Sequence, residues 1–113
     1  MTEPARGEVW LADLDPTIGR EHAGKRPVLV LSEDTFNRGP ADLVVVLPMT
    51  TREKRIPSHV PLRSPEGGVR VDSFVICEAV RSISKQRLAS RWGVVSPSTL
   101  RVVEDTLRIL LGL

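Results

Sequence analysis

The sequence is poor in cysteine and in aromatic residues. It has 113 residues with one cysteine, no tyrosine, two tryptophans and two phenylalanines. A lone cysteine, Cys77, cannot form a disulfide within the chain, and the two histidines, His22 and His59, lie far from it in the sequence. Zinc sites in proteins usually show closely spaced pairs of such ligands. We therefore expect neither a disulfide nor a structural metal.

Long apolar segments are also missing. The longest apolar run is far shorter than the roughly 20 residues that span a bilayer. The first six residues, MTEPAR, are polar and lack the apolar region of a signal peptide. The prolines and glycines are dispersed rather than collected into a linker, and the length suits one domain. These features predict a soluble, cytoplasmic protein with a single domain over residues 1–113, without membrane contact.

The charge is unevenly distributed although the formal net charge is only +2. Residues 79–103 contain five basic side chains and no acidic one, and a second basic stretch occupies residues 52–55. The first fifteen residues carry more acids than bases. A positive face and an anionic partner would follow from this pattern, although a solvated surface would produce the same pattern.

Short β-like runs recur along the chain. They lie at residues 8–12, 28–32, 43–50, 59–62, 69–71, 73–80 and 93–95. The runs at 28–31 and 43–47 are continuously apolar, as expected for strands covered on both faces or curled into a small barrel. A Ser-Pro-Glu-Gly-Gly turn at residues 64–68 should join its flanking strands as a hairpin. The pattern is that of a β-barrel or sandwich.

The last segment changes to helical periodicity. Ser96 suits an N-cap and Pro97 the first helical position. Apolar residues then follow at helical spacing, at positions 100, 103, 107, 110 and 111. On a helical wheel, further apolar residues widen the apolar arc beyond half of the helix circumference. We predict a helix that packs on its own barrel and against a second subunit.

Arg26 is the strongest single candidate for a binding site. It follows a long polar loop over residues 15–25 and precedes Pro27 and a buried strand, which would hold its guanidinium in a fixed direction. A fixed guanidinium can bind a phosphate through two parallel hydrogen bonds. The alternative is an ion pair with Asp13 or Asp15 at the barrel rim.

Thr50 and Thr51 close a predicted strand beside the second basic stretch. Their hydroxyls could donate to phosphate oxygens or to bases at the strand end. Threonine is also common in strands for reasons of packing alone. Neither residue is diagnostic by itself.

Three blocks of sequence resemble the MazF/PemK ribonuclease toxins. The first block comprises residues 7–16 and 19–32, from Gly-Glu-Val-Trp to Arg-Pro-Val-Leu-Val-Leu-Ser. The second comprises residues 46–51 with Pro57 and His59, and the third residues 72–73, 80–83 and 85–88. Together with the C-terminal helix they cover nearly the whole chain.

The resemblance implies a mainly β fold with a C-terminal helix, an SH3-like, partly open β-barrel of the CcdB/PemK type. It implies a homodimer whose basic face binds single-stranded RNA, and a type II toxin that cleaves mRNA at specific sequences without metal or cofactor. Attack by the 2′-hydroxyl would leave a 2′,3′-cyclic phosphate and a 5′-hydroxyl. A cognate acidic antitoxin would cover the RNA groove, and the pair would also bind DNA.

The resemblance also implies roles for particular residues. The family's catalytic arginine and threonine fall on Arg26 and Thr50, and its loop acid falls on Glu21, the best available general base. Further RNA contacts are expected from His22, Lys25, Thr51, Arg52, Lys54, Arg81, Lys85 and Arg87. Family members often have glutamine where this chain has Ala79, so a base contact made by that amide would be missing here.

Other interpretations remain open at this stage. A histidine pair could do acid–base work, but His22 has no evident partner and His59 is better explained as a packed or rim residue. Trp10 and Trp92 could stack on bases, although core packing explains both more simply. A gyrase-inhibiting toxin of the same fold, or an RNA-binding module without catalysis, would share the barrel. Such gyrase toxins look as if they end in a tryptophan-containing tail, whereas this chain ends in Ile-Leu-Leu-Gly-Leu.

Overall fold

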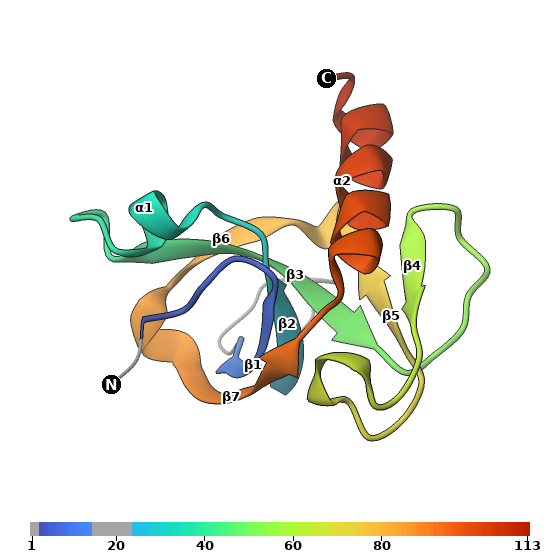
Figure 1. Cartoon of the computed structure of the whole chain (residues 1–113), viewed down its shortest axis with the longest axis horizontal. Helices are drawn as coiled ribbons and strands as arrows, with labels where there is room; N and C mark the ends of the chain where they lie inside the picture. The colour runs from blue at the N-terminus through green and yellow to red at the C-terminus, as the bar shows by residue number, and fades with distance from the viewer. Residues whose placement is uncertain (1–2, 15–23) are drawn as a thin grey trace.

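The computed structural model of the chain describes residues 3–14 and 24–113, which form a strongly twisted β-structure with a helix standing beside it (Figure 1). The strands and helices are, in chain order, β1 (Glu8–Asp13), β2 (Lys25–Val30), α1 (Asp34–Asn37), β3 (Leu43–Thr50), β4 (His59–Leu62), β5 (Ser73–Ile76), β6 (Arg81–Ser84), β7 (Leu88–Val94) and α2 (Pro97–Leu111). Three short 3₁₀ turns accompany them: η1 (Glu66–Gly68), η2 (Cys77–Ala79) and η3 (Lys85–Arg87).

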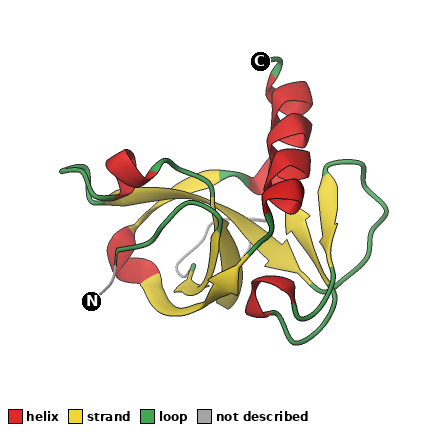
Figure 2. Cartoon of the chain, in the orientation of Figure 1, coloured by secondary structure: helices red, strands yellow, loops and turns green. Residues whose placement is uncertain are grey.

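The strands pair in the order β4-β5-β3-β2-β1-β7, with β6 beside the first half of β3, and every pairing is antiparallel. β3 is the central strand, since it pairs with β2, with β6 and, through its last two residues, with β5. The outermost strands of this order, β4 and β7, are not paired with each other in the described part of the chain (Figure 2). The predicted mainly β, partly open barrel is therefore confirmed.

Alternate residues of the central strands enter two separate cores. One core contains Val28 and Val30 of β2 with Val44 and Val46 of β3, and it fills the barrel interior around Trp10. The other contains the intervening Leu29, Leu47 and Met49, which pack toward β4, β5 and α2. Both faces of β2 and β3 are thus buried, which explains the continuous apolar runs in the sequence.

The C-terminal helix has the predicted limits. The Ser96 hydroxyl accepts a hydrogen bond from the Thr99 N–H at 3.2 Å, and Gly112 ends α2 in the left-handed conformation. Val103 and Leu107 are buried in the second core, so packing of α2 on its own barrel is confirmed. Among the described residues, no helix combines the length and the apolar character needed to cross a membrane.

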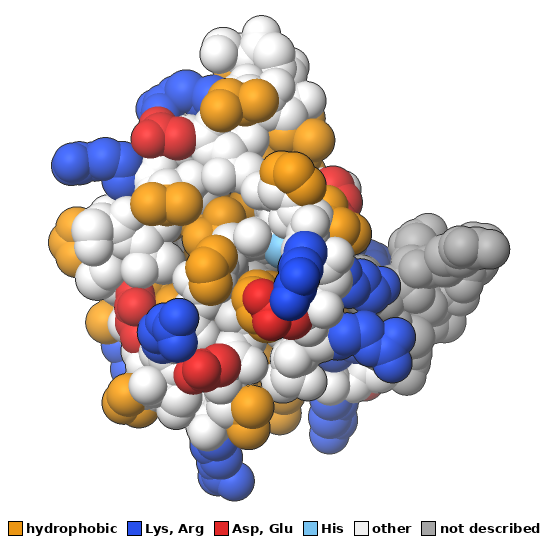
Figure 3. Space-filling model, turned by 90° about the vertical axis from the view of Figure 1, so that its right-hand side faces the viewer, with side chains coloured by type: hydrophobic (Ala, Val, Ile, Leu, Met, Phe, Trp, Pro, Cys, Tyr) orange, Lys and Arg blue, Asp and Glu red, His pale blue; other side chains and the backbone are white. Residues whose placement is uncertain are grey.

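Several apolar side chains are exposed on α2 and directly after its C-terminal end. Ile109 is 84% exposed and Leu113 is 85% exposed, and Val102 and Leu111 are about half exposed. Figure 3, which views the molecule from the side of α2, β4 and β5, shows hydrophobic side chains spread over this face. The second-subunit contact that the sequence predicts would cover this surface, and it stays a prediction.

Some predicted strand limits were wrong. Residues 69–71 form no strand, because Ser64 folds this segment locally by donating from its hydroxyl to the Val69 carbonyl and from its N–H to Asp72. The hairpin therefore forms between residues 59–62 and the next predicted run, from His59 opposite Ile76 to Leu62 opposite Ser73. The run at 73–80 is divided, because η2 turns the chain after β5 and sends it into β6 beside β3.

The ends of two other strands also differ from the prediction. β7 begins at Leu88 rather than Gly93, and β2 begins at Lys25 rather than Val28. The short helix α1 has no counterpart among the predicted elements. Trp10 is buried as expected, whereas Trp92 is 37% exposed on β7, so its predicted place in the core was wrong.

Candidate functional site

A cleft opens where β2 and β3 separate. Their pairing stops at Val28 opposite Pro48, and one step further the register would set Pro27 opposite Met49. Neither proline has an N–H to donate to the ladder. The strands diverge there and leave a space of about 540 Å³. It is lined by Lys25, Arg26, Pro27, Met49, Thr50, Thr51, Arg52, Lys54 and Ser73.

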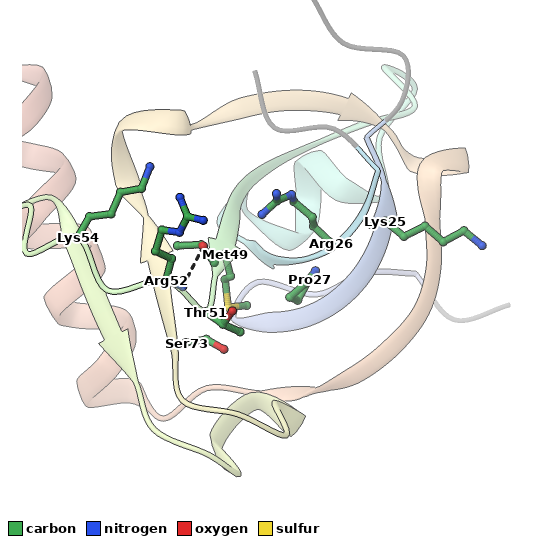
Figure 4. A pocket seen from close by; sticks show the side chains of 9 residues that line it. Lys25, Arg26, Pro27, Met49, Thr51, Arg52, Lys54 and Ser73 are labelled. Atoms are coloured by element: carbon green, nitrogen blue, oxygen red, sulfur yellow. Dashed lines mark hydrogen bonds between the residues drawn. The ribbon is translucent and has the colours of Figure 1, made fainter. Parts of the chain in front are cut away.

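Arg26 enters this cleft from β2. Side chains two residues apart share a face of a strand, so Arg26 lies on the same face as Val28 and Val30. Continuing the register of β2 and β3 by two residues sets Arg26 opposite Thr50. In Figure 4 the half-buried Arg26 side chain extends from β2 toward the centre of the cleft, while Lys25 points away from it. The strands therefore direct Arg26 and Thr50 to the two walls of one space.

Thr50 forms the last residue of β3 and the start of a turn. Its Oγ1 accepts a hydrogen bond from the Arg52 N–H at 3.1 Å. This short-range bond, typical of threonine at turns, directs the chain back so that Arg52 and Lys54 border the cleft (Figure 4). The bond uses the oxygen as acceptor and leaves the O–H available as a donor.

The cleft is strongly electropositive. Its described lining contains two arginines and two lysines and no aspartate or glutamate. Several like charges around a concave space raise the local positive potential and attract anions. A guanidinium and a hydroxyl on facing walls can together donate to the non-bridging oxygens of one phosphate. The geometry suits a phosphodiester chain.

Six of the residues predicted from the sequence meet in this cleft. They are Arg26, Thr50, Lys25, Thr51, Arg52 and Lys54. Glu21 and His22, and the proposed alternative partner Asp15, lie outside the described residues. Three lining residues, Pro27, Met49 and Ser73, were not predicted. The strand register could have indicated the first two, since they flank Arg26 and Thr50 directly.

Three predicted RNA contacts do not line the cleft. Arg81 is half-buried on β6 opposite Val46. The Lys85 ammonium lies 3.1 Å from the Glu3 carboxylate and donates to the Asn37 carbonyl at 2.8 Å, with its side chain only 15% exposed. Arg87 donates to the backbone carbonyl of Asp13 at 3.2 Å. These interactions hold Lys85 and Arg87 to the barrel.

His59 lies outside the cleft lining as well. Its side chain is 5% exposed and its Nε2 lies 2.7 Å from the Glu78 carboxylate, so the predicted packed role is confirmed. Burial raises the pKa of Glu78, but hydrogen bonds from Ser58 and His59 outweigh that effect and hold it below its usual value. Burial and the Glu78 charge raise the pKa of the buried Cys77 thiol to about 11. Within the described ranges no three potential ligands of the His, Cys, Asp and Glu types are grouped to hold a metal ion.

Comparison with known proteins gives consistent results. Residues 5–111 match the family described as PemK-like, MazF-like toxin of type II toxin-antitoxin system. Endoribonuclease EndoA of Bacillus subtilis is 35% identical over 109 residues, which cover 96% of this chain and 94% of that protein. MazF of Deinococcus radiodurans superposes with a TM-score of 0.89 at 31% identity, with both chains fully covered. A MazE-MazF structure from the same organism gives 0.83 at 31% identity, covering 100% and 99%.

Proposed function

This chain belongs to the PemK-like, MazF-like toxin family of type II toxin-antitoxin systems, and from that premise we propose that it is an endoribonuclease that cuts single-stranded RNA in the cleft between β2 and β3. The observation that carries the proposal is the position of Arg26 opposite Thr50 in a cleft whose described charges are all positive. The activity is the one named for the 35% identical B. subtilis relative.

The reaction needs no nucleophile from the protein. The ribose 2′-oxygen attacks the adjacent phosphorus, the bond to the 5′-oxygen breaks, and a 2′,3′-cyclic phosphate and a 5′-hydroxyl result. A base must take the 2′-hydroxyl proton, and an acid must give a proton to the leaving 5′-oxygen. Negative charge grows on the non-bridging oxygens of the phosphorane between these steps. Donors already aimed at those oxygens stabilise the transition state.

Arg26 suits that charge stabilisation. Its guanidinium stays protonated at neutral pH and offers up to five N–H donors in a rigid plane. It can hold the phosphorane oxygens and, as the acid, give a proton to the leaving 5′-oxygen; the proton that the base takes from the 2′-hydroxyl then returns to the guanidinium through bulk water. Thr50 adds a neutral O–H donor from the facing wall. Both groups stand on strands with buried continuations, which keeps their separation fixed.

The general base is the part that the cleft itself does not supply. Its described lining includes only hydroxyl, ammonium and guanidinium groups among the polar side chains. We assign the base to Glu21, whose loop joins β1 to Arg26 in the sequence but lies outside the described residues. A carboxylate with a normal pKa near 4.3 is a weak base, so partial desolvation by bound RNA would help it.

The remaining cations would position the RNA rather than react with it. Lys25, Arg52 and Lys54, with the Thr51 hydroxyl, border the cleft and would hold phosphates on either side of the cut. His22 would act from the undescribed loop. Arg81, Lys85 and Arg87 could contact RNA only beyond the cleft. Binding through so many phosphates should weaken steeply as salt rises.

Partners follow from the same family. A MazF of D. radiodurans has been solved with MazE, and a mycobacterial endoribonuclease with its cognate antitoxin. We propose an acidic antitoxin that competes with RNA for the basic cleft in the cytoplasm. We also propose a homodimer formed through the exposed apolar side chains at the C-terminal end of α2 and directly after it, where Ile109 and Leu113 are more than four-fifths exposed.

The first test is incubation of the purified chain with long single-stranded RNA in excess EDTA, with the cut sites and the 3′ ends mapped. We expect discrete cuts with 2′,3′-cyclic phosphate ends. Arg26→Ala should lower kcat by about 10²- to 10³-fold while retaining much of the RNA affinity. Arg108→Ala is the matched control, because Arg108 is an exposed arginine on α2 paired with Asp105.

Two results would contradict the proposal. Intact RNA over a range of sequences would favour a gyrase-type toxin or a passive RNA-binding protein. Cleavage that survives Arg26→Ala undiminished would mean that the reaction takes place elsewhere on the surface.

A further inference from the structure

A second pocket adjoins the basic cleft and has a different chemical character. It has a volume of about 440 Å³ and shares Thr51 and Ser73 with the cleft, so these two residues lie between the two spaces. Its other lining residues come from the turn after β3 and from the β4–β5 hairpin. They are Glu53, Pro61, Leu62, Arg63, Val71, Asp72 and Phe74.

Phe74 is a direct cross-strand neighbour of the proposed catalytic threonine. The β3–β5 register pairs Thr50 with Phe74, and the β5–β4 register pairs Phe74 with Pro61. Directly paired residues of antiparallel strands place their side chains on the same face, with Cβ atoms about 5 Å apart. Phe74 is only half-buried although a large apolar ring gains most from full burial. An accessible ring therefore lies one strand away from Thr50.

The charges of the two spaces are opposite. The cleft has four basic side chains, whereas this pocket has two carboxylates, Glu53 and Asp72, and one arginine, Arg63. The Arg63 guanidinium lies 3.8 Å from Asp72, but its side chain is 86% exposed, so it compensates the carboxylate weakly. A phosphate would be repelled by these acids. A nucleobase amino group would be attracted, since carboxylates accept from such donors.

We propose that this pocket binds the base of a nucleotide adjacent to the cut phosphate, with Phe74 stacking on the base and with Glu53 and Asp72 selecting a base that has an exocyclic amino group. Cytosine, adenine and guanine have such a group and uracil does not. The inference rests on the proposed function, because the RNA strand held at Arg26 and Thr50 is what brings the neighbouring base to Thr51 and Ser73. It makes the pocket a determinant of sequence preference.

In a chain with so few aromatic residues, a single ring can still contribute to base recognition. Phosphate contacts in the cleft are blind to sequence, since every nucleotide has the same backbone. Stacking orients the base but tolerates all four, because each has a π-face. Selection among the four bases then depends on the two carboxylates, which we propose to meet the edge of the stacked base. The three functions are thereby assigned to separate groups: Arg26 and its neighbours, Phe74, and the acid pair.

The test compares variants on oligoribonucleotides that differ only in the bases flanking one cut site. Phe74→Leu keeps an apolar side chain and removes the ring; we expect KM to rise about 5- to 100-fold with kcat nearly unchanged. Glu53→Gln and Asp72→Asn keep size and hydrogen-bonding capacity. We expect each to bring the kcat/KM ratio between cytidine and uridine substrates closer to one. The controls are Phe36→Leu, a 39% exposed phenylalanine on α1, and Glu33→Gln, an exposed acid beside it.

Unchanged KM in Phe74→Leu, or an unchanged base preference in both acid variants, would overturn the proposal. A parallel binding measurement separates this from failure of the nuclease proposal. It uses 2′-deoxy-substituted oligonucleotides, which bind but cannot be cut. If the wild-type chain cuts no RNA but binds these probes in a Phe74-dependent way, the nuclease is wrong and the base pocket stands. If it neither cuts RNA nor shows Phe74-dependent binding, both are wrong.

Discussion

Thr50 combines a structural and a chemical task in one hydroxyl. Its oxygen accepts from the Arg52 N–H and so shapes the turn that brings two cations to the cleft. Its hydrogen is the donor that we assign to the phosphate. Serine can do both, because it has the same hydroxyl, whereas valine can do neither although its shape matches threonine.

Substitution can therefore test what the hydroxyl contributes as a whole. We expect Thr50→Ser to cut RNA within a few-fold of the wild-type rate, and Thr50→Val to lose about 10²-fold in kcat. Single-turnover cleavage in excess enzyme measures the chemical step, and urea unfolding checks that both variants are folded. A fully active Thr50→Val would remove this hydroxyl from the mechanism.

The sequence predicted which strand-end residues lie together in the cleft better than it predicted where the other basic side chains lie; the roles of all of them stay predictions. Arg26 and Thr50 were predictable because each stands at the end of a strand, and strand alternation fixes where such a side chain points. Lys85 was expected to bind RNA, yet its ammonium bonds the Asn37 carbonyl and Glu3. A pattern of charge along the chain does not reveal such distant partners, because lysine has a long flexible side chain.

Among the elements, the crossing of η1 over β7 depends on the absence of side chains. A Cβ built on Gly68 would lie 2.3 Å from the Trp92 carbonyl oxygen, and one built on Gly93 would lie 2.7 Å from the carbonyl carbon of Gly67. Two backbones can approach this closely only where glycine is present. The contact seats the β4–β5 connection, and with it one wall of the pocket at Phe74, on the barrel.

Gly93→Ala should therefore destabilise the fold through backbone displacement. We expect a loss of about 1–3 kcal/mol in the free energy of unfolding, the usual cost of overpacking. Urea unfolding followed by tryptophan fluorescence measures it, with Gly112→Ala as control. That glycine has open space around it and pays only for its φ of 71°, about 1 kcal/mol. Equal losses in the two variants would contradict the close-crossing explanation.

The elements were predictable to the extent that local signals define them. Helix α2 has an N-cap serine, an N1 proline and regular apolar spacing, and its limits follow from these alone. The end of β5 at Ile76 and the start of a separate strand β6 at Arg81 have no such signal. They depend on β3, which pairs with β5 near its end and with β6 near its start, and only the assembled sheet shows this.

The whole molecule presents two unlike surfaces. The mouth of the barrel is basic and polar around Arg26, whereas the C-terminal end of α2 and the residues after it expose apolar side chains, with Ile109 and Leu113 almost fully exposed. An apolar surface of this kind is costly to leave in water. A second copy of the chain would cover it and would set two basic clefts in one assembly.

Ile109→Glu is expected to weaken that assembly. Losing the burial of one isoleucine and burying a charge instead should raise the dimer dissociation constant by at least about 10-fold. Sedimentation velocity over a concentration series gives the constant. Arg101→Glu, a charge reversal at an exposed residue about two turns earlier in the same helix, should leave this constant nearly unchanged. A wild-type chain that sediments as a monomer at high concentration would refute the dimer.

The two buried faces of β2 and β3 bear on how such a protein can be controlled. Arg26 and Thr50 are continuous with strands that supply both cores. Segments of this kind open only when most of the fold opens, so the strands that hold Arg26 and Thr50 are nearly as durable as the molecule. Local rearrangement is then a poor means of silencing it. Control must come from a molecule that occupies the cleft, and activity returns at the rate at which that molecule leaves or is destroyed.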